Sequence, residues 1–321
     1  MSAVKLKLTM YSTLALIIGF TTLIISIVLS AIGAFSLYAV LSIVLFMNVL
    51  QWLLAPYIIE AIYRVREADP ARYSWLYEAV RRLARKSRIE PPKLMISSLP
   101  IPNAFAYGSP LTGNRIAVTE GLLRNLDPDE VEAVIGHEIG HLVHRDVHIM
   151  MLVSIIPAIL YYIGRSMMWS SMFYGGRDRE ERGGYALLGL VLFVAAFILN
   201  LMVLGLSRLR EYYADRHSAS IVENGAVKLQ VALAKIVHAT SRVSRKVDTS
   251  ALHSFRALLI ADPATAHADA ALISGEYALV KRLKERELTF ADLVEEMFST
   301  HPNIVRRLKA LDEVAAELGQ K

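Results

Sequence analysis

The chain of 321 residues is 54% hydrophobic and only 20% charged, with a mean hydropathy of +0.40, which excludes an ordinary soluble globular protein. It contains no cysteine, so imidazole and carboxylate groups must hold any metal ion that it binds. The net charge of +5 fits basic segments resting on an anionic lipid bilayer, and no interleaved aromatic and basic pattern points to nucleic acid as a partner.

Two apolar segments open the chain, at residues 10–32 and 34–59, with Gly33 near the turn between them. Each is long enough to cross a bilayer as a helix, which needs about 20 apolar residues. They predict a first transmembrane hairpin over residues 1–62. A cleaved signal peptide is the alternative for the first segment, because Lys5 and Lys7 precede it and small residues end it. The apolar run exceeds the usual length of roughly 7 to 15 residues, however, and a second span follows at once.

A polar segment at residues 63–146 follows the first hairpin. Three short strands are predicted in it, over residues 93–98, 103–107 and 115–119, where apolar residues alternate or run together between Pro and Gly breaks. The start of the segment is rich in arginine and lysine, whereas the linker between the first two spans has neither, so we expect this segment on the cytoplasmic side. The basic residues are Arg64, Arg66, Arg72, Arg81, Arg82, Arg85, Lys86 and Arg88.

A helix is predicted to begin at the end of this segment. Asp127 suits the N-cap, Pro128 the first helical position, and the two acidic residues that follow favour the positive end of the helix dipole. Apolar residues then recur at helical spacing as far as Leu142. The motif His-Glu-Ile-Gly-His at residues 137–141 therefore lies within a helix.

Two histidines four positions apart project from the same face of a helix, so His137 and His141 can direct one imidazole nitrogen each at a single zinc ion. Glu138 is rotated by about 100° from His137 and should reach a water on that ion, as general base, rather than the ion itself. The alternative is that both histidines are core residues whose ring nitrogens bond backbone carbonyl groups.

A second transmembrane hairpin is predicted over residues 147–206, from apolar segments at 147–169, which Pro157 interrupts, and at 185–206. A charged run at residues 177–182, bracketed by glycine pairs, indicates a solvated loop between them. An even number of spans separates the polar segments, so residues 63–146 and 207–321 should share the cytoplasmic face. One protease domain can then be built from both.

The third metal ligand is expected just after the fourth span. Glu211 is the candidate, and Asp215 lies one turn later on the same side, where it can accept the free ring N–H of a ligating histidine. The alternative is that both carboxylates pair with Arg208 or Arg210 on a solvated helix. A third histidine six residues after His141 would be another solution, but Val147 stands there.

These residues together resemble the HtpX-like membrane zinc metalloproteases, relatives of the CAAX prenyl endoproteases. The resemblance covers most of the chain and the order of its membrane hairpins. The zinc motif alone is shared by many proteases, whereas the combination in this order is specific. It is carried by the zinc motif, by residues 207–215 with Glu211, by Asn103-Ala104-Phe105-Ala106, and by Ser299-Thr300-His301-Pro302 with Arg307.

The resemblance implies further roles. The segment containing Asn103, Ala104, Phe105 and Ala106 would be an exposed edge strand that pairs with the substrate backbone, although an ordinary hairpin strand with Phe105 in the core is an alternative that can hold as well. His301 would stabilise the oxyanion, and as an isolated residue it is equally an exposed histidine at a helix start. Arg307 would orient a carboxylate or His301 itself.

We therefore expect a mainly α membrane protein with four transmembrane helices and a gluzincin-like domain that carries a small β-sheet. With one Zn²⁺ per chain, it would be an endopeptidase of the cell membrane that hydrolyses misfolded or damaged membrane proteins at the cytoplasmic face; this role in quality control and stress response comes from the resemblance alone. A processing protease for a defined lipidated or membrane substrate and a non-catalytic metal-binding scaffold are the alternatives. A site within the bilayer is disfavoured, because acidic residues open the motif helix.

Overall fold

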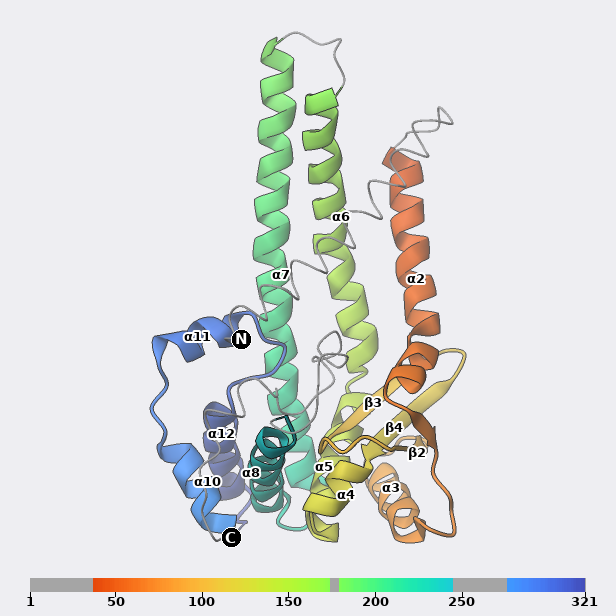
Figure 1. The fold of residues 1–321 in the computed structure, drawn as a ribbon, viewed down its shortest axis with the longest axis vertical. Coiled ribbons are helices and arrows are strands. Elements are labelled where there is room, and N and C mark those ends of the chain that lie inside the picture. The colour runs from red at the N-terminus through yellow and green to blue at the C-terminus, as the bar shows by residue number, and fades with distance from the viewer. Residues whose placement is uncertain (1–36, 174–178, 245–275, 321) are drawn as a thin grey trace. The chain divides into compact units, whose positions relative to one another are not determined.

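The computed structural model describes residues 37–173, 179–244 and 276–320, which are mostly helical and include a small mixed sheet (Figure 1). The chain divides into two compact units. We call Leu53–Val147 with Ser207–Lys321 the site unit, and Ala3–Trp52 with His148–Leu206 the span unit. The predicted first span at residues 10–32 lies outside the described residues, so a total of four spans stays a prediction.

Helices α2 (Leu37–Ile62), α6 (Asp146–Phe173) and α7 (Arg179–Ile221) supply the span unit. Among the described residues, three segments are long and apolar enough to cross a membrane: Leu45–Ile62, Ile149–Trp169 and Gly184–Ile221. They coincide with the second, third and fourth predicted spans. The loop predicted at residues 177–182 is wrong from Arg179 onward, where α7 begins; Arg and Glu are good helix formers, and acidic residues near the first turn favour a helix start.

The site unit contains a four-stranded sheet in the order β1-β2-β4-β3. Strands β2 and β4 run parallel, and the other two pairs are antiparallel. The three predicted strands are present, within one to two residues at their ends. The strand that the sequence did not predict is β1, whose three residues are too short and too polar to show a pattern. The bounds are β1 Val65–Glu67, β2 Lys93–Ser97, β3 Ala104–Ser109 and β4 Gly113–Thr119.

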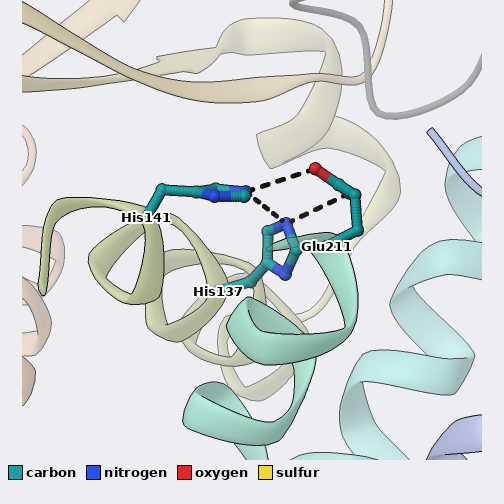
Figure 2. Close-up of side chains that lie close together, drawn as sticks. All are labelled: His137, His141 and Glu211. Atoms are coloured by element: carbon teal, nitrogen blue, oxygen red, sulfur yellow. Dashed lines mark hydrogen bonds and ion pairs between the residues drawn. The ribbon is translucent and has the colours of Figure 1, made fainter. Parts of the chain in front are cut away.

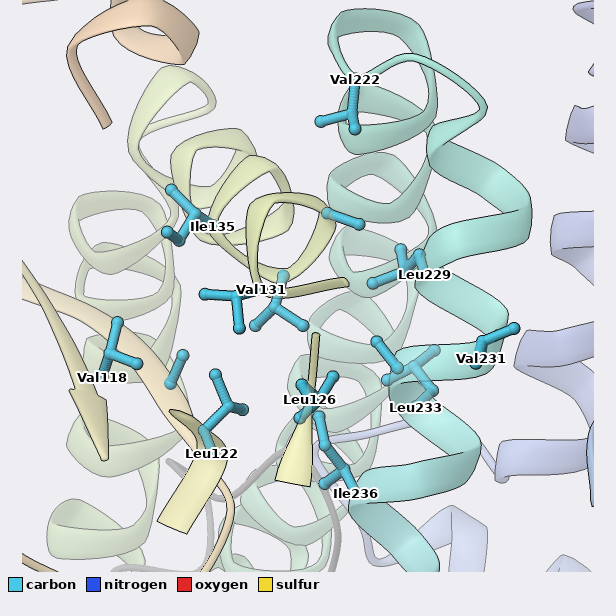
Figure 3. Packing of buried hydrophobic residues seen from close by; sticks show 14 of the residues in the cluster. Val118, Leu122, Leu126, Val131, Ile135, Val222, Leu229, Val231, Leu233 and Ile236 are labelled. Carbon is cyan, nitrogen blue, oxygen red and sulfur yellow. The ribbon is translucent and has the colours of Figure 1, made fainter. Parts of the chain in front are cut away.

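Helices pack with this sheet around one apolar core, in which α5 is central. Figure 3 shows Val131 and Ile135 of α5 among side chains of α4, β4 and α8, and both are buried. Burial of an aliphatic side chain contributes about 1.5–3 kcal/mol, so α5 is held firmly. The helices are α3 (Ser74–Lys86), α4 (Glu120–Asn125), α5 (Pro128–Val143), α8 (Gly225–Ser244), α10 (Glu276–Glu285), α11 (Phe290–Met297) and α12 (Ile304–Glu317).

The start of α5 agrees with its sequence. Asp127 is the N-cap, and its N–H donates to the Glu130 carboxylate at 2.9 Å in a capping box. The Lys235 ammonium group lies 2.7 Å from Glu130 Oε1 and 3.0 Å from Asp127 Oδ2, which ties this end of α5 to α8. The His-Glu-Ile-Gly-His motif accordingly lies in the second half of α5, in regular helix.

Candidate metal centre

The site forms where α5 and α7 approach closely. A Cβ atom at Gly140 would lie 2.9 Å from Ala214 Cα, and one at Gly136 would lie 2.9 Å from Ser218 Oγ. Ser218 Oγ also donates to the Ala133 carbonyl at 2.6 Å. Two glycines one turn apart therefore let the helices nearly touch, and this contact carries Glu211 of α7 to the histidines of α5.

Three donor atoms converge there, as Figure 2 shows. His137 Nε2 and His141 Nε2 are 3.1 Å apart, and Glu211 carboxylate oxygens lie 3.7 Å from the first and 3.4 Å from the second. Ligands about 2.0–2.2 Å from a tetrahedral ion would be about 3.3 Å from one another. Within the part of the chain that the structure describes, this group of three has the spacing of a metal site, and two imidazoles with a carboxylate suit zinc.

Each histidine is oriented by a buried carboxylate. His137 Nδ1 lies 2.9 Å from Asp215 Oδ1, as the sequence predicted for Asp215. His141 Nδ1 lies 2.6 Å from Asp146 Oδ2, a residue for which the sequence predicted either a surface position or a supporting position behind the metal ligands. Both contacts leave Nε2 directed at the common centre. In the sequence, Asp146 is only an acidic residue shortly after the motif. That position does not predict its contact with His141, which depends on the path of the chain after α5.

Asp146 also changes the proton affinity of His141. Burial alone lowers the pKa of the His141 imidazole, but hydrogen bonds with Asp146 and Glu211 raise it to about 10. Arg210 in turn forms an ion pair with Asp146 and donates to the His144 carbonyl at 3.1 Å. His141 therefore lies in a field of negative charge that favours any cation, whether a proton or a metal ion.

Arg307 of α12 neutralises the buried carboxylates. Its Nε and one terminal nitrogen each lie 2.7 Å from an Asp215 oxygen, and the other terminal nitrogen lies 3.1 Å from Glu211 Oε2. A bidentate pair of this kind fixes both partners. Of the two roles expected for Arg307, orienting a carboxylate is the one that the contacts favour.

His301 stands between α11 and α12, with its Nδ1 atom 3.1 Å from Glu211 Oε2. Its side chain is partly exposed, unlike those of His137 and Glu211. The structure therefore places a partly exposed imidazole beside Glu211, and its predicted role at the oxyanion stays a prediction.

Glu138 lies next to β3. The Ala106 N–H donates to Glu138 Oε2 at 2.8 Å. Burial raises the pKa of the Glu138 carboxyl, and positive charge on His137 and His141 opposes the rise. A buried carboxyl with a raised pKa holds an accepted proton more readily than an exposed one does.

Strand β3 is an edge of the sheet, because β4 is its one neighbour among the described strands. The side chains of Asn103, Ala104 and Phe105 are buried, and the Phe105 ring lies 4.9 Å from that of Tyr63. Phe105 packs in a core, as the alternative for this segment predicted, and the backbone of β3 runs along an edge beside Glu138, while its pairing with a substrate stays a prediction.

The alternative in which Glu211 and Asp215 pair with neighbouring arginines on a solvated helix is wrong, since both carboxylates are buried and face the histidines. Arg208 instead donates to backbone carbonyl groups of Glu296, Met297 and Ser299, while Arg210 contacts Asp146. Their guanidinium groups thus anchor other parts of the chain.

Comparison with known proteins is consistent with this geometry. The profile of Peptidase family M48 matches residues 70–315. A Protease HtpX homolog of Aeropyrum pernix is 42% identical over 276 residues, covering 85% of each chain. Protease HtpX homolog 2 of Saccharolobus solfataricus is 39% identical, covering 97% of this chain and 98% of its own. The crystal structure of S. mikatae Ste24p matches in fold with a TM-score of 0.57 at 18% identity, covering 97% of this chain and 67% of that one.

Proposed function

The chain belongs to peptidase family M48 and is a membrane metalloprotease, and we propose that it hydrolyses peptide bonds with one zinc ion held by His137, His141 and Glu211. The observation that carries this proposal is the convergence of the three side chains, whose donor atoms all lie within 4.8 Å of one another. Their surroundings support it, because carboxylates behind both histidines make the centre attractive to a cation.

Zinc bound there would supply a Lewis acid that polarises the substrate carbonyl and acidifies water. Glu138 takes a proton from the attacking water as the new carbon–oxygen bond forms, and it delivers that proton to the amide nitrogen as the carbon–nitrogen bond breaks. The raised pKa of Glu138 favours its acceptance of the proton. His301 donates to the oxygen on which negative charge develops.

The substrate pairs with the free edge of β3. Backbone hydrogen bonds to Ala104 and to the Ala106 carbonyl would hold an extended peptide beside Glu138, whose carboxylate accepts the Ala106 N–H. Such pairing gives affinity without demanding a particular sequence. It therefore suits misfolded or damaged membrane proteins, which share no sequence but expose extended backbone.

The site faces the cytoplasm in this proposal. All eight arginine and lysine residues between positions 64 and 88 are exposed. Positively charged segments next to membrane spans stay on the cytoplasmic side. The proteolytic centre would then meet substrates at the inner surface of the cell membrane.

The test combines metal content with proteolysis for the full-length protein in lipid. Glu211→Ala should lose zinc and activity together, whereas Glu138→Gln should keep zinc and lose turnover by several orders of magnitude. Glu132→Gln is a matched control on α5, because Glu132 pairs with Arg82 away from the site and should leave both quantities unchanged. Near-normal cleavage by Glu138→Gln, or full zinc content in Glu211→Ala, would refute the proposal.

The substrate class needs its own measurement. Unfolded membrane proteins should be cleaved at several positions, and a prenylated peptide should be no better a substrate than its unmodified form. Strong preference for the prenylated peptide would instead favour a processing protease.

A further inference from the structure

Helix α11 has its polar and apolar faces reversed relative to a helix of a soluble domain. Phe290, Leu293, Val294 and Met297 recur at helical spacing and form one apolar face, yet Phe290 is 80% exposed and Met297 49% exposed. The acidic side chains of the same helix are more buried, with Glu296 9% and Asp292 12% exposed. A surface helix normally turns its apolar stripe towards the core.

The acidic face of α11 is bound to neighbouring segments of the site unit, and these contacts keep it from turning outward. Glu296 accepts the Asn303 N–H at 3.1 Å and lies 3.4 Å from an Arg306 nitrogen. Asp292 closes a capping box with Thr289 and forms an ion pair with Arg286. Rotating the apolar residues inward would break the contacts of Glu296 with Asn303 and Arg306, so these contacts hold the apolar face on the outside.

The far end of α11 is attached to α7 at a defined point. Arg208 donates to the carbonyl oxygens of Glu296 and Ser299, both at 2.8 Å, and to that of Met297 at 3.3 Å. The apolar run of α7 ends at Leu206, two residues before Arg208, or about 3 Å along the helix axis. The carbonyl groups at the end of α11 therefore accept hydrogen bonds from a residue of α7 that lies just beyond its apolar run.

We infer that α11 is an in-plane helix whose apolar face lies in the boundary between headgroups and acyl chains of the bilayer that α7 spans. An exposed apolar face of this kind marks an interaction site, and its attachment through Arg208, two residues beyond the apolar run of α7, makes lipid its occupant. Because His301 follows closely in sequence, α11 also anchors the chain that leads into the site.

The absence of cysteine makes a direct test possible. A nitroxide attached at Phe290→Cys or Val294→Cys in the full-length protein, in phosphatidylcholine and phosphatidylglycerol vesicles, should collide more often with oxygen, which concentrates in hydrocarbon, than with a water-soluble nickel chelate. Ala316→Cys, exposed on α12, is the aqueous control and should show the opposite ratio. Access by the nickel chelate at residues 290 and 294 would overturn the inference. Protection from both agents would also overturn it, since another protein segment or a second copy would then cover the face.

The attachment through Arg208 is tested in the same assay. Arg208→Ala should lower the ratio of oxygen to nickel collisions at residue 294 at least twofold. Arg216 lies on α7 as Arg208 does, and it forms an exposed ion pair with Glu317 of α12. Arg216→Ala removes that pair and should leave the ratio unchanged. Equal ratios in the two variants would overturn the role of Arg208 as the anchor. These measurements do not depend on proteolysis, so they stand apart from the test of the catalytic proposal.

Discussion

Each histidine of the proposed metal centre has both ring nitrogens engaged. Nε2 faces the common centre, and Nδ1 faces a buried carboxylate, Asp215 for His137 and Asp146 for His141. A carboxylate in that position selects the tautomer that presents a lone pair to a metal ion and holds the plane of the ring. The site is therefore prepared by residues from two parts of the chain, residues 137–146 and Asp215.

We predict that Asp146→Asn and Asp215→Asn each weaken zinc binding by about 10- to 100-fold, because an amide no longer offers the charge that orients and polarises the ring. Competition with a chromophoric chelator would measure the dissociation constant. Asp129→Asn, on the exposed start of α5, is the matched control and should bind as the unaltered protein does. Unchanged affinity in both site variants would contradict this account.

Zinc affinity should also depend on pH. With its pKa raised to about 10, His141 is protonated in the metal-free protein at neutral pH, but only the neutral ring can ligate. One proton must leave on binding, so affinity should rise with pH, by about tenfold per unit between pH 6 and 8. Asp146→Asn lowers the pKa of His141 and should flatten this slope. A slope of zero in the unaltered protein would count against His141 as a ligand.

At the scale of the elements, the contact between α5 and α7 decides whether the site exists. Gly136 and Gly140 lie on the face of α5 that meets Ala214 and Ser218. Side chains larger than hydrogen would push α7 outward and carry Glu211 away from the histidines. The glycine inside the zinc motif is thus explained by helix packing, not by backbone conformation.

Gly140→Val should lower the midpoint of thermal unfolding and reduce zinc content, because its Cβ would lie 2.9 Å from Ala214 Cα; overpacking of this kind costs about 1–3 kcal/mol. The matched control is Gly184→Val on α7, where an added Cβ meets no atom within 4 Å. Full zinc content and an unchanged midpoint in Gly140→Val would show that the contact is looser than described.

At the scale of the whole molecule, two polar segments separated by about 60 residues of apolar hairpin build one site unit. His137 and Glu211 come from different segments, so the site requires both segments on one side of the membrane. An even number of spans between them satisfies this requirement.

Single cysteines in the cysteine-free chain would test this orientation. Arg85→Cys and Glu313→Cys, one in each polar segment, should react with a membrane-impermeant maleimide only after the cell membrane is opened. Gly184→Cys, at the other end of the apolar part of α7, should react in intact cells. Labelling of Arg85→Cys in intact cells would contradict a cytoplasmic site, and opposite behaviour of Arg85→Cys and Glu313→Cys would contradict the shared face.

The sequence by itself determined those features that depend on local geometry and composition. The spacing of His137 and His141, the helix start at Asp127 and the presence of three apolar helices all follow from helical periodicity, capping preferences and the thickness of a bilayer. Glu211 and Asp215 could also be named as candidates, since they follow a span and fit a known family pattern.

Only the tertiary structure decided which distant groups meet. The contact of Asp146 with His141, that of Arg307 with Asp215, and the outward apolar face of α11 depend on how helices cross and where the chain turns. The periodicity of apolar residues does not predict these contacts, because each contact results from the packing of many side chains around α5. Local patterns therefore predicted the ligands, whereas global packing selected the residues that hold them in place.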